Sequence, residues 1–108
     1  MSGVRGRVRV GPRARHGRGL FARRRLRRGC AIGRFEGEPT RRDGEHVLWW
    51  RDEDGVEQGL QVSNLLRYLN HSRRPNAEVE GLELRAIRNI QPGAEILIDY
   101  GPDWADVE

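Results

Sequence analysis

Three short groups of residues in this sequence have types and spacings that could do chemistry. The first runs from His16 to Ala22, where Gly17 and Gly19 flank Arg18 just before an apolar segment. Glycine allows the backbone to approach a ligand closely, although paired glycines more often serve a bulge or a tight turn. By itself, this group predicts a loop whose backbone can be approached closely by another group, and it indicates no particular ligand.

The second group is a polar loop, Arg67 to Asn76, that follows an apolar segment and contains Pro75. Asn70 carries both a hydrogen-bond donor and an acceptor, as recognition of a purine edge or an amino-acid head group requires. A lone Asn or His in a loop more often folds that loop. The pair Asn70-His71, followed by Pro75-Asn76, is a less common combination and favours a binding role.

The third group runs from Gly93 to Gly101 and consists of a turn, an apolar strand and Tyr100 at the exit of the strand. A strand end can present a reactive group on a rigid support. An isolated tyrosine there is more often a core ring with its hydroxyl bonded to nearby backbone. Position alone leaves both readings open for Tyr100.

Short apolar segments separated by turn signals must position these groups, and their spacing of about 8 to 12 residues predicts a small, mostly β fold, α+β by strict class. Gln91-Pro92-Gly93 has the residues of a type II turn, Asp52 to Gly55 and Glu80-Gly81 resemble hairpin connections, and Ser63 could cap a short helical turn to about Leu69. The predicted strands are Arg7 to Val10, Leu20 to Ala22, Ala31 to Phe35, His46 to Trp50, Leu60 to Val62, Leu82 to Ala86 and Ile96 to Asp99.

Length and composition limit the classes of protein. A chain of 108 residues supports one core, so we expect a single domain over residues 1–108. No apolar run approaches the roughly 20 residues of a membrane helix, and the first ten residues do not resemble a secretion signal. Cys30 is the single cysteine and forms no zinc-ligand spacing with the histidines, so we expect no metal and a reducing, cytoplasmic location.

The charge is unevenly distributed along the chain. All 20 basic residues are arginine; residues 1–42 hold 14 of them against two acids, and residues 43–108 hold six against 14 acids. Such polarity could attract polyanions at one end and cationic peptides at the other. For the run Arg23 to Arg28, ordinary solvated charge is the more common reading, and contact with nucleic acid through the Arg-rich N-terminal half is the alternative.

In this order and at these separations, the three groups resemble the SET-domain protein lysine methyltransferases, from about Val8 to Gly101. The resemblance implies several short sheets with a knot-like threaded C-terminal segment, a core over about 8–101 and a short tail over 102–108. It also implies S-adenosylmethionine as cofactor and a protein lysine as substrate. The residues that match cofactor-binding positions are Gly17, Arg18, Gly19, Arg67, Asn70, His71 and Tyr100, and Tyr100 also matches the tyrosine that faces the point of methyl transfer.

The sequence departs from the family pattern around the lysine channel. Arg73 stands where a cysteine is common, and Ala94 replaces a frequent glutamate while Glu95 is kept. No cysteine-rich segment flanks the domain, so we expect the zinc-clamped tail that closes the channel in many relatives to be missing. Asp103-Trp104 is the candidate for the channel wall that this tail would form, and an ordinary C-terminal aromatic packed on the core is about equally common. The usual mid-domain tyrosine has no clear counterpart, and Trp49 or Trp50 either takes its place in the channel or belongs to the core.

The resemblance therefore predicts a methyltransferase that acts on lysines of other proteins, because the chain contains no lysine of its own. We expect the substrate protein to be basic, because the acidic second half of the chain would attract a basic segment. The alternatives are an Arg-rich nucleic-acid-binding module and a degenerate relative that binds cofactor without turnover. The sequence does not indicate the oligomeric state.

Overall fold

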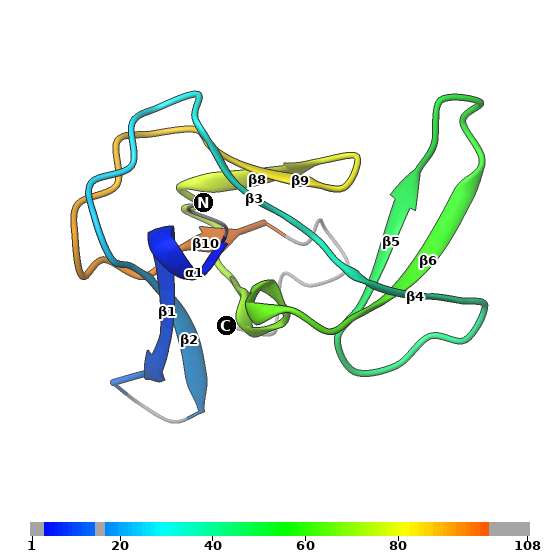
Figure 1. Ribbon diagram of the computed structural model, residues 1–108, viewed down its shortest axis with the longest axis horizontal. Helices are drawn as coiled ribbons and strands as arrows, with labels where there is room; N and C mark the ends of the chain where they lie inside the picture. Colours follow the sequence, from blue (N-terminus) through cyan, green and yellow to red (C-terminus); the bar gives the residue numbers. More distant parts are fainter. Residues whose placement is uncertain (1–3, 15–16, 100–108) are drawn as a thin grey trace.

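The fold is built from short strands and very little helix, as the sequence predicts. The structure, a computed structural model, describes residues 4–14 and 17–99 (Figure 1). Its helical elements are α1 (Val4–Arg7) and the 3-10 helix η1 (Leu65–Tyr68). Its strands are β1 (Val8–Pro12), β2 (Arg18–Ala22), β3 (Ala31–Arg34), β4 (Gly37–Thr40), β5 (Val47–Arg51), β6 (Glu57–Val62), β7 (Asn70–His71), β8 (Ala77–Glu80), β9 (Glu83–Ala86) and β10 (Leu97–Ile98).

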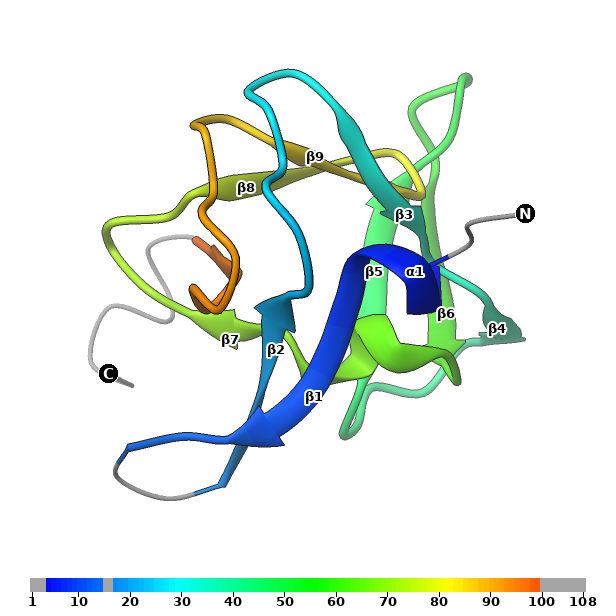
Figure 2. The ribbon, with the colours of Figure 1, turned by 60° about the vertical axis from the view of Figure 1, so that its left-hand side comes forward.

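The strands form four small sheets around a shared centre. β1 pairs with β2, β3-β9-β8 and β4-β6-β5 are three-stranded, and β10 pairs with β7. The first three sheets are antiparallel, whereas β7 and β10 run parallel and pair Leu97 with Asn70 and Ile98 with His71. In Figure 1 the β5–β6 hairpin projects to the right, away from β10, and in Figure 2 β7 lies to the left of β5 and β6.

One hydrophobic core joins these sheets. Strand residues alternate between core and surface, so Leu84 and Ala86 of β9 are buried while Glu83 and Arg85 are half-buried. The core residues come from every sheet and from the connecting segments. They are Val8, Leu20, Ala22, Leu26, Ile32, Phe35, Val62, Leu66, Leu69, Ala77, Leu84, Ala86, Ile90, Ile96 and Ile98.

The C-terminal segment lies between β7 and the start of β8. On the β8 side, Asn76 holds this segment: its Oδ1 accepts a hydrogen bond from the Leu97 amide (2.8 Å) and its Nδ2 donates to the Glu95 carbonyl (2.8 Å). On the β7 side, the Ser72 amide donates to the Ile98 carbonyl (2.9 Å). This arrangement is the described part of the expected threaded segment, and residues 100–108 lie outside the described residues.

The predicted turns and most strands are confirmed, with shifted ends, but several details differ. β4, β7, β8 and α1 were not predicted. The proposed cap at Ser63 is wrong: η1 begins one residue later, its cap position is Asn64, and the Asn64 side chain instead donates to the Arg34 carbonyl (2.8 Å). Among the described residues, no helix is long and apolar enough to cross a membrane.

Candidate active site

The three sequence groups meet at Asn70. Its side-chain Nδ2 donates to the Arg18 carbonyl (2.9 Å) and to a carboxylate oxygen of Glu95 (3.1 Å), so one amide joins the first group to the third. The parallel pairing of β7 with β10 sets this junction, because it places Asn70 beside Leu97, two residues after Glu95. Residues far apart in sequence are therefore held within hydrogen-bonding distance.

The orientation of the Asn70 amide leaves its acceptor for a ligand. Both kinds of contact recorded for this side chain use Nδ2, to backbone carbonyls and to Glu95. Within residues 4–14 and 17–99, no donor is bonded to the carbonyl oxygen Oδ1 of Asn70. An amide fixed through its N–H groups presents an acceptor of defined direction, which suits a cationic ligand group such as an α-ammonium.

Glu95 links Asn70 to Arg13 at the junction. Its side chain is only 18% exposed, and one carboxylate oxygen lies 3.0 Å from Nε of Arg13 in the β1–β2 loop. The same carboxylate occupies the space beside Gly19, where a Cβ would overlap it. A side chain at position 19 would therefore force the Glu95 carboxylate to shift, so Gly19 favours the observed position of Glu95.

Gly17 differs from Gly19 in its surroundings. It has a positive φ of 77°, which favours glycine, and apart from its two chain neighbours no described residue has an atom within 4 Å of a Cβ built there. Arg18, between the two glycines, is exposed and contributes its carbonyl to Asn70. The loop thus combines an open side at Gly17 with a packed side at Gly19.

His71 lies next to the end of the described chain. Its side chain is buried, at 3% exposure, and its Nδ1 lies 3.7 Å from Oδ1 of Asp99. Asp99 precedes Tyr100 in the sequence, and Tyr100 lies outside the described residues. The predicted catalytic position therefore follows directly on a residue held beside His71.

Arg67 contacts its own helix. Its guanidinium donates to the carbonyls of Ser63 (2.7 Å) and Asn64 (2.9 Å) and stacks over the Tyr68 ring, 4.6 Å from the ring centroid. These contacts close η1 and fix Tyr68. The cofactor-binding role expected for Arg67 stays a prediction.

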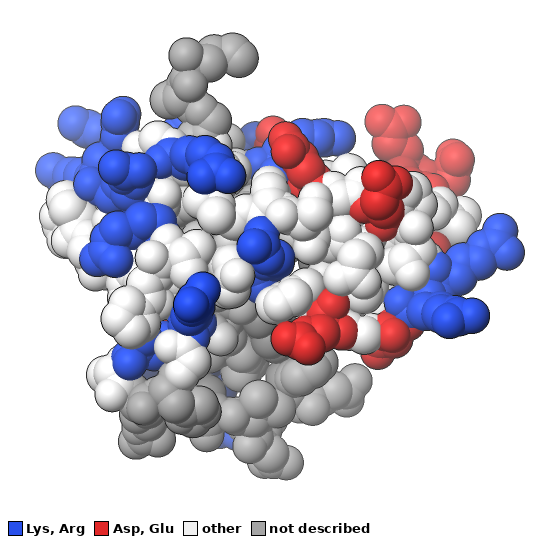
Figure 3. All heavy atoms as spheres, turned by 60° about the horizontal axis from the view of Figure 1, so that its bottom comes forward, with Lys and Arg blue, Asp and Glu red and all other residues white. Residues whose placement is uncertain are grey.

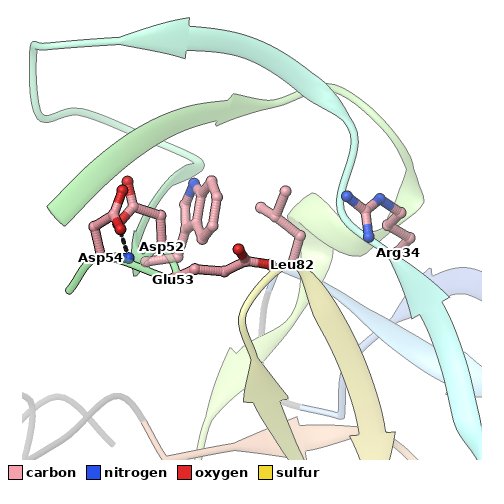
Figure 4. Close-up of a pocket in the computed structure, with 6 residues that line it drawn as sticks. Arg34, Asp52, Glu53, Asp54 and Leu82 are labelled. Carbon is pink, nitrogen blue, oxygen red and sulfur yellow. Dashed lines mark hydrogen bonds between the residues drawn. The ribbon is translucent and has the colours of Figure 1, made fainter. Parts of the chain in front are cut away.

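The two tryptophans of β5 face opposite sides of their hairpin, as adjacent strand residues do. Trp49 lies across Gly59 and donates from Nε1 to Asp43 (3.0 Å). Trp50 lines a hollow together with Arg34, Asp52, Glu53, Asp54 and Leu82 (Figure 4). This hollow shares no residue with the junction at Asn70, and Trp104, the third predicted channel residue, lies outside the described residues.

Two residues of the junction, Arg13 and Glu95, were not predicted as site residues. Glu95 could have been suspected, because it stands inside the third group just before the apolar strand. Arg13 gives no such signal, since 82 positions separate it from Glu95. In the described part of the chain, no three His, Cys, Asp or Glu residues are grouped so that they could hold a metal ion.

Comparison with known proteins agrees with this arrangement. The SET-domain family profile matches residues 17–101. The chain is 29% identical, over 119 aligned positions, to the Schizosaccharomyces pombe histone-lysine N-methyltransferase specific for H3 lysine 4. That match covers 89% of this chain but 13% of the relative, so the chain spans only a small part of the relative's length.

Solved structures share the same fold. The methyltransferase domain of human PR domain-containing protein 2 superposes with a TM-score of 0.70 at 21% identity, over 93% of this chain and 83% of that one. The structure of ctPRC2 in an autoinhibited conformation bound to S-adenosylmethionine gives a TM-score of 0.72 at 23% identity, over 90% and 16%. At these identities the likeness shows the fold, and the profile match together with the convergence at Asn70 shows that this chain belongs to the SET-domain family.

Proposed function

We propose that this chain is a protein lysine methyltransferase that uses S-adenosylmethionine. The observation that carries the proposal is the junction at Asn70, where the Gly17–Gly19 loop, the Asn70-His71 pair and the segment leading to Tyr100 come together. Support comes from the curated relative, which is a histone-lysine methyltransferase, and from a structural neighbour bound to S-adenosylmethionine.

The residues at the junction fit the charged end of this cofactor. Its α-ammonium would be held by the Asn70 Oδ1 acceptor and by nearby backbone carbonyls, with the half-buried carboxylate of Glu95 supplying negative potential. The open side of Gly17 leaves room for close approach of a ligand. The exposed guanidinium of Arg18 is a candidate partner for the α-carboxylate.

The bound cofactor would supply a methyl group on a positively charged sulfur, to which the lone pair of an uncharged amine could bond as the carbon–sulfur bond breaks and a neutral thioether leaves. A free lysine amine has a pKa near 10.4, so having it neutral at pH 8 costs about 3.3 kcal/mol. Holding the reacting atoms in line can contribute about 7 to 11 kcal/mol. The task of the protein is therefore mainly to orient the amine, and proton loss to water is sufficient.

We assign the orienting role to Tyr100. A tyrosine hydroxyl is mostly neutral near pH 8, because its ordinary pKa is near 10. It can accept a hydrogen bond from the amine and present a partial negative charge, and it needs no base strength for either. Asp99, which directly precedes Tyr100 in the sequence, lies beside His71, and this supports the role.

The substrate of the proposed reaction is a separate protein. The chain has no lysine, so it cannot modify its own side-chain amines. Carboxylates on the β5–β6 turn favour a basic substrate segment, and Trp50 lines the hollow beside them. The expected intracellular location stays a prediction.

The test is a transfer assay with tritiated S-adenosylmethionine against a whole-cell protein extract. We expect labelled protein bands whose amino-acid hydrolysates contain methyl-lysine, and we expect the Tyr100→Phe variant to lose the label while it still binds the cofactor. Cofactor binding without label in the parent chain would instead identify a relative that no longer turns over. Label that persists undiminished in Tyr100→Phe would remove Tyr100 from the mechanism.

A further inference from the structure

Six arginines from two distant loops form one surface, which we call the arginine surface. Five lie in the loop between β2 and β3 and the sixth lies in the connection between β9 and β10, and all six side chains are exposed. Figure 3 shows basic side chains gathered toward the left, where Figure 1 places these two loops. The members are Arg23, Arg24, Arg25, Arg27, Arg28 and Arg88.

The two loops are fixed to each other. Leu26 and Ile90 exchange backbone hydrogen bonds of 2.8 Å in both directions, and both side chains are buried in the core. The Arg28 amide also donates to Oδ1 of Asn89 (2.9 Å). The arginines on either side of Leu26 are therefore presented by an anchored segment, and little backbone conformational freedom would be lost when a partner binds.

The guanidinium groups of this surface have no acidic partners among the residues that the structure describes. Elsewhere Arg13 pairs with Glu95, and Arg85 pairs with Glu80 and Glu83. In the part of the chain that the structure describes, no carboxylate lies within 4 Å of any of the six, and the contact recorded for Arg23 is to the neutral carbonyl of Arg5. A concentration of unneutralised charge of one sign attracts a polyanion.

Chemistry favours the phosphate backbone of a duplex as that polyanion. Double-stranded DNA carries one negative charge per roughly 1.7 Å of its axis, and guanidinium groups match phosphate oxygens with two parallel hydrogen bonds. Single-stranded binding would need aromatic side chains for base stacking. The two loops, residues 23–30 and 87–96, contain no aromatic residue.

The location separates this surface from the candidate active site. β2 runs from Arg18, whose carbonyl accepts from Asn70, to Ala22, and these four steps span about 13 Å before the arginine surface begins at Arg23. The β5–β6 hairpin projects on the opposite side of the molecule (Figure 1). A duplex on the arginine surface would leave the Asn70 junction and the hairpin accessible.

We infer that the arginine surface docks this protein on the phosphate backbone of double-stranded nucleic acid, independently of base sequence. The arginine surface does not coincide with the basic first half of the sequence. It omits Arg13, Arg34, Arg41 and Arg42 of the first half and includes Arg88 of the second.

The test compares two double variants with the same change in net charge. Arg24→Ser/Arg25→Ser removes two guanidiniums from the arginine surface, and Arg41→Ser/Arg42→Ser removes an equally exposed adjacent pair in the β4–β5 loop. Binding to a fluorescent duplex of random sequence is measured by anisotropy over a series of salt concentrations. Thermal unfolding shows that each variant is folded.

We expect the parent chain to bind with a steep salt dependence. The surface variant should bind about tenfold or more weakly at low salt, with the slope of log K against log salt reduced by about two, while the control pair changes affinity by less than about twofold. Equal losses in the two variants, or no binding by the parent at low salt, would overturn the inference. Displacement of the duplex by poly-glutamate at equal charge would identify an acidic protein as the partner and would also overturn it.

Discussion

Glu95 connects the residues of the candidate active site to one another. It accepts from Asn70, pairs with Arg13 and fills the space that a side chain at Gly19 would need. A half-buried carboxylate with two partners is sensitive to loss of its charge, because each partner then keeps an unsatisfied donor. Glu95 is thus a positioning residue for Asn70.

The change Glu95→Gln keeps the size of the side chain and removes its charge. We expect S-adenosylmethionine to bind about tenfold more weakly, because hydrogen bonds to charged groups contribute about 1.5 to 3 kcal/mol. The KM for the cofactor should rise more than kcat falls, since the variant alters the cradle and leaves Tyr100 in place. Initial-rate kinetics measure both quantities.

The matched control is Glu45→Gln, at a highly exposed glutamate near His46. Its cofactor affinity should equal that of the parent chain. A folded Glu95→Gln variant with parental KM for the cofactor would show that the contact of Glu95 with Asn70 has no bearing on cofactor binding.

At the scale of elements, Asn76 attaches the C-terminal segment to the rest of the fold. Its side chain satisfies both the Leu97 amide and the Glu95 carbonyl. We expect Asn76→Ala to lower the free energy of unfolding by about 1 to 3 kcal/mol, because two backbone groups lose their partner. Each kcal/mol corresponds to a fall of about 4 to 8 °C in Tm for a domain of this size.

Thermal unfolding followed by circular dichroism measures this effect. The control is Asn89→Ala, which removes a single exposed hydrogen bond to the Arg28 amide and should change Tm less. Equal Tm values for Asn76→Ala and the parent would mean that β10 is held by its pairing with β7 alone.

Asp52 shapes the turn between β5 and β6. Its carboxylate accepts hydrogen bonds from the amides of Asp54 and Val56 and from the Gln58 side chain. The Gln58 contact and then the Val56 amide lower the pKa of Asp52 below its ordinary value of 3.8. A lowered folded-state pKa means that the carboxylate stabilises the turn above its ordinary pKa and that this contribution is lost as the pH falls through the folded value.

We therefore expect the amides of Asp54 and Val56 to lose protection from hydrogen exchange as the pH falls below the ordinary value of 3.8 and through the lower folded pKa of Asp52, and to lose it at neutral pH in Asp52→Ala. Exchange measured by NMR and corrected for the intrinsic pH dependence tests this. The neighbouring Glu53→Ala serves as control and should retain protection. Unchanged protection of both amides in Asp52→Ala would show that the backbone alone sets the turn.

Local rules predicted the elements that depend on their own residues. The Gln91-Pro92-Gly93 turn has the expected positive φ at Gly93 (85°) and a bond from the Ala94 amide to the Gln91 carbonyl. β4 has no large apolar residue, and β7 has two residues whose strand character depends on pairing with the distant β10. Neither could be predicted from a local pattern.

In the candidate site, too, some features could be predicted from the sequence and others depend on the tertiary fold. Resemblance indicated Gly17, Gly19, Asn70 and His71, and the structure brings the two groups together through the Arg18 carbonyl. The ion pair between Arg13 and Glu95 depends on the tertiary fold, so sequence spacing contains no signal for it. Local rules also offered two roles for the glycines, and the fold separates them: Gly19 faces Glu95, whereas Gly17 faces no described residue other than its chain neighbours.

At the scale of the whole molecule, basic side chains dominate one end, whereas the other end carries charges of both signs. Figure 3 shows basic side chains gathered toward the left and both acidic and basic side chains toward the right. Carboxylates of the β5–β6 turn beside Trp50 would attract a basic substrate segment. Screening by salt should weaken this attraction without altering the junction that holds the cofactor.

We accordingly expect the KM for a basic protein substrate to rise severalfold between low salt and about 0.5 M salt, while the Kd for S-adenosylmethionine changes little. In Glu53→Gln/Asp54→Asn the salt dependence of KM should be smaller. A KM that does not respond to salt would show that the acidic hairpin has no part in substrate capture.

The central claim is that the junction around Asn70 binds S-adenosylmethionine. Equilibrium dialysis with radiolabelled cofactor measures this binding directly and does not depend on identifying a substrate. We predict saturable binding of one cofactor per chain and at least about tenfold weaker binding by Asn70→Ala, a loss of about 1.4 kcal/mol. No binding by the folded parent chain, or equal affinity in the parent and Asn70→Ala, would contradict the account.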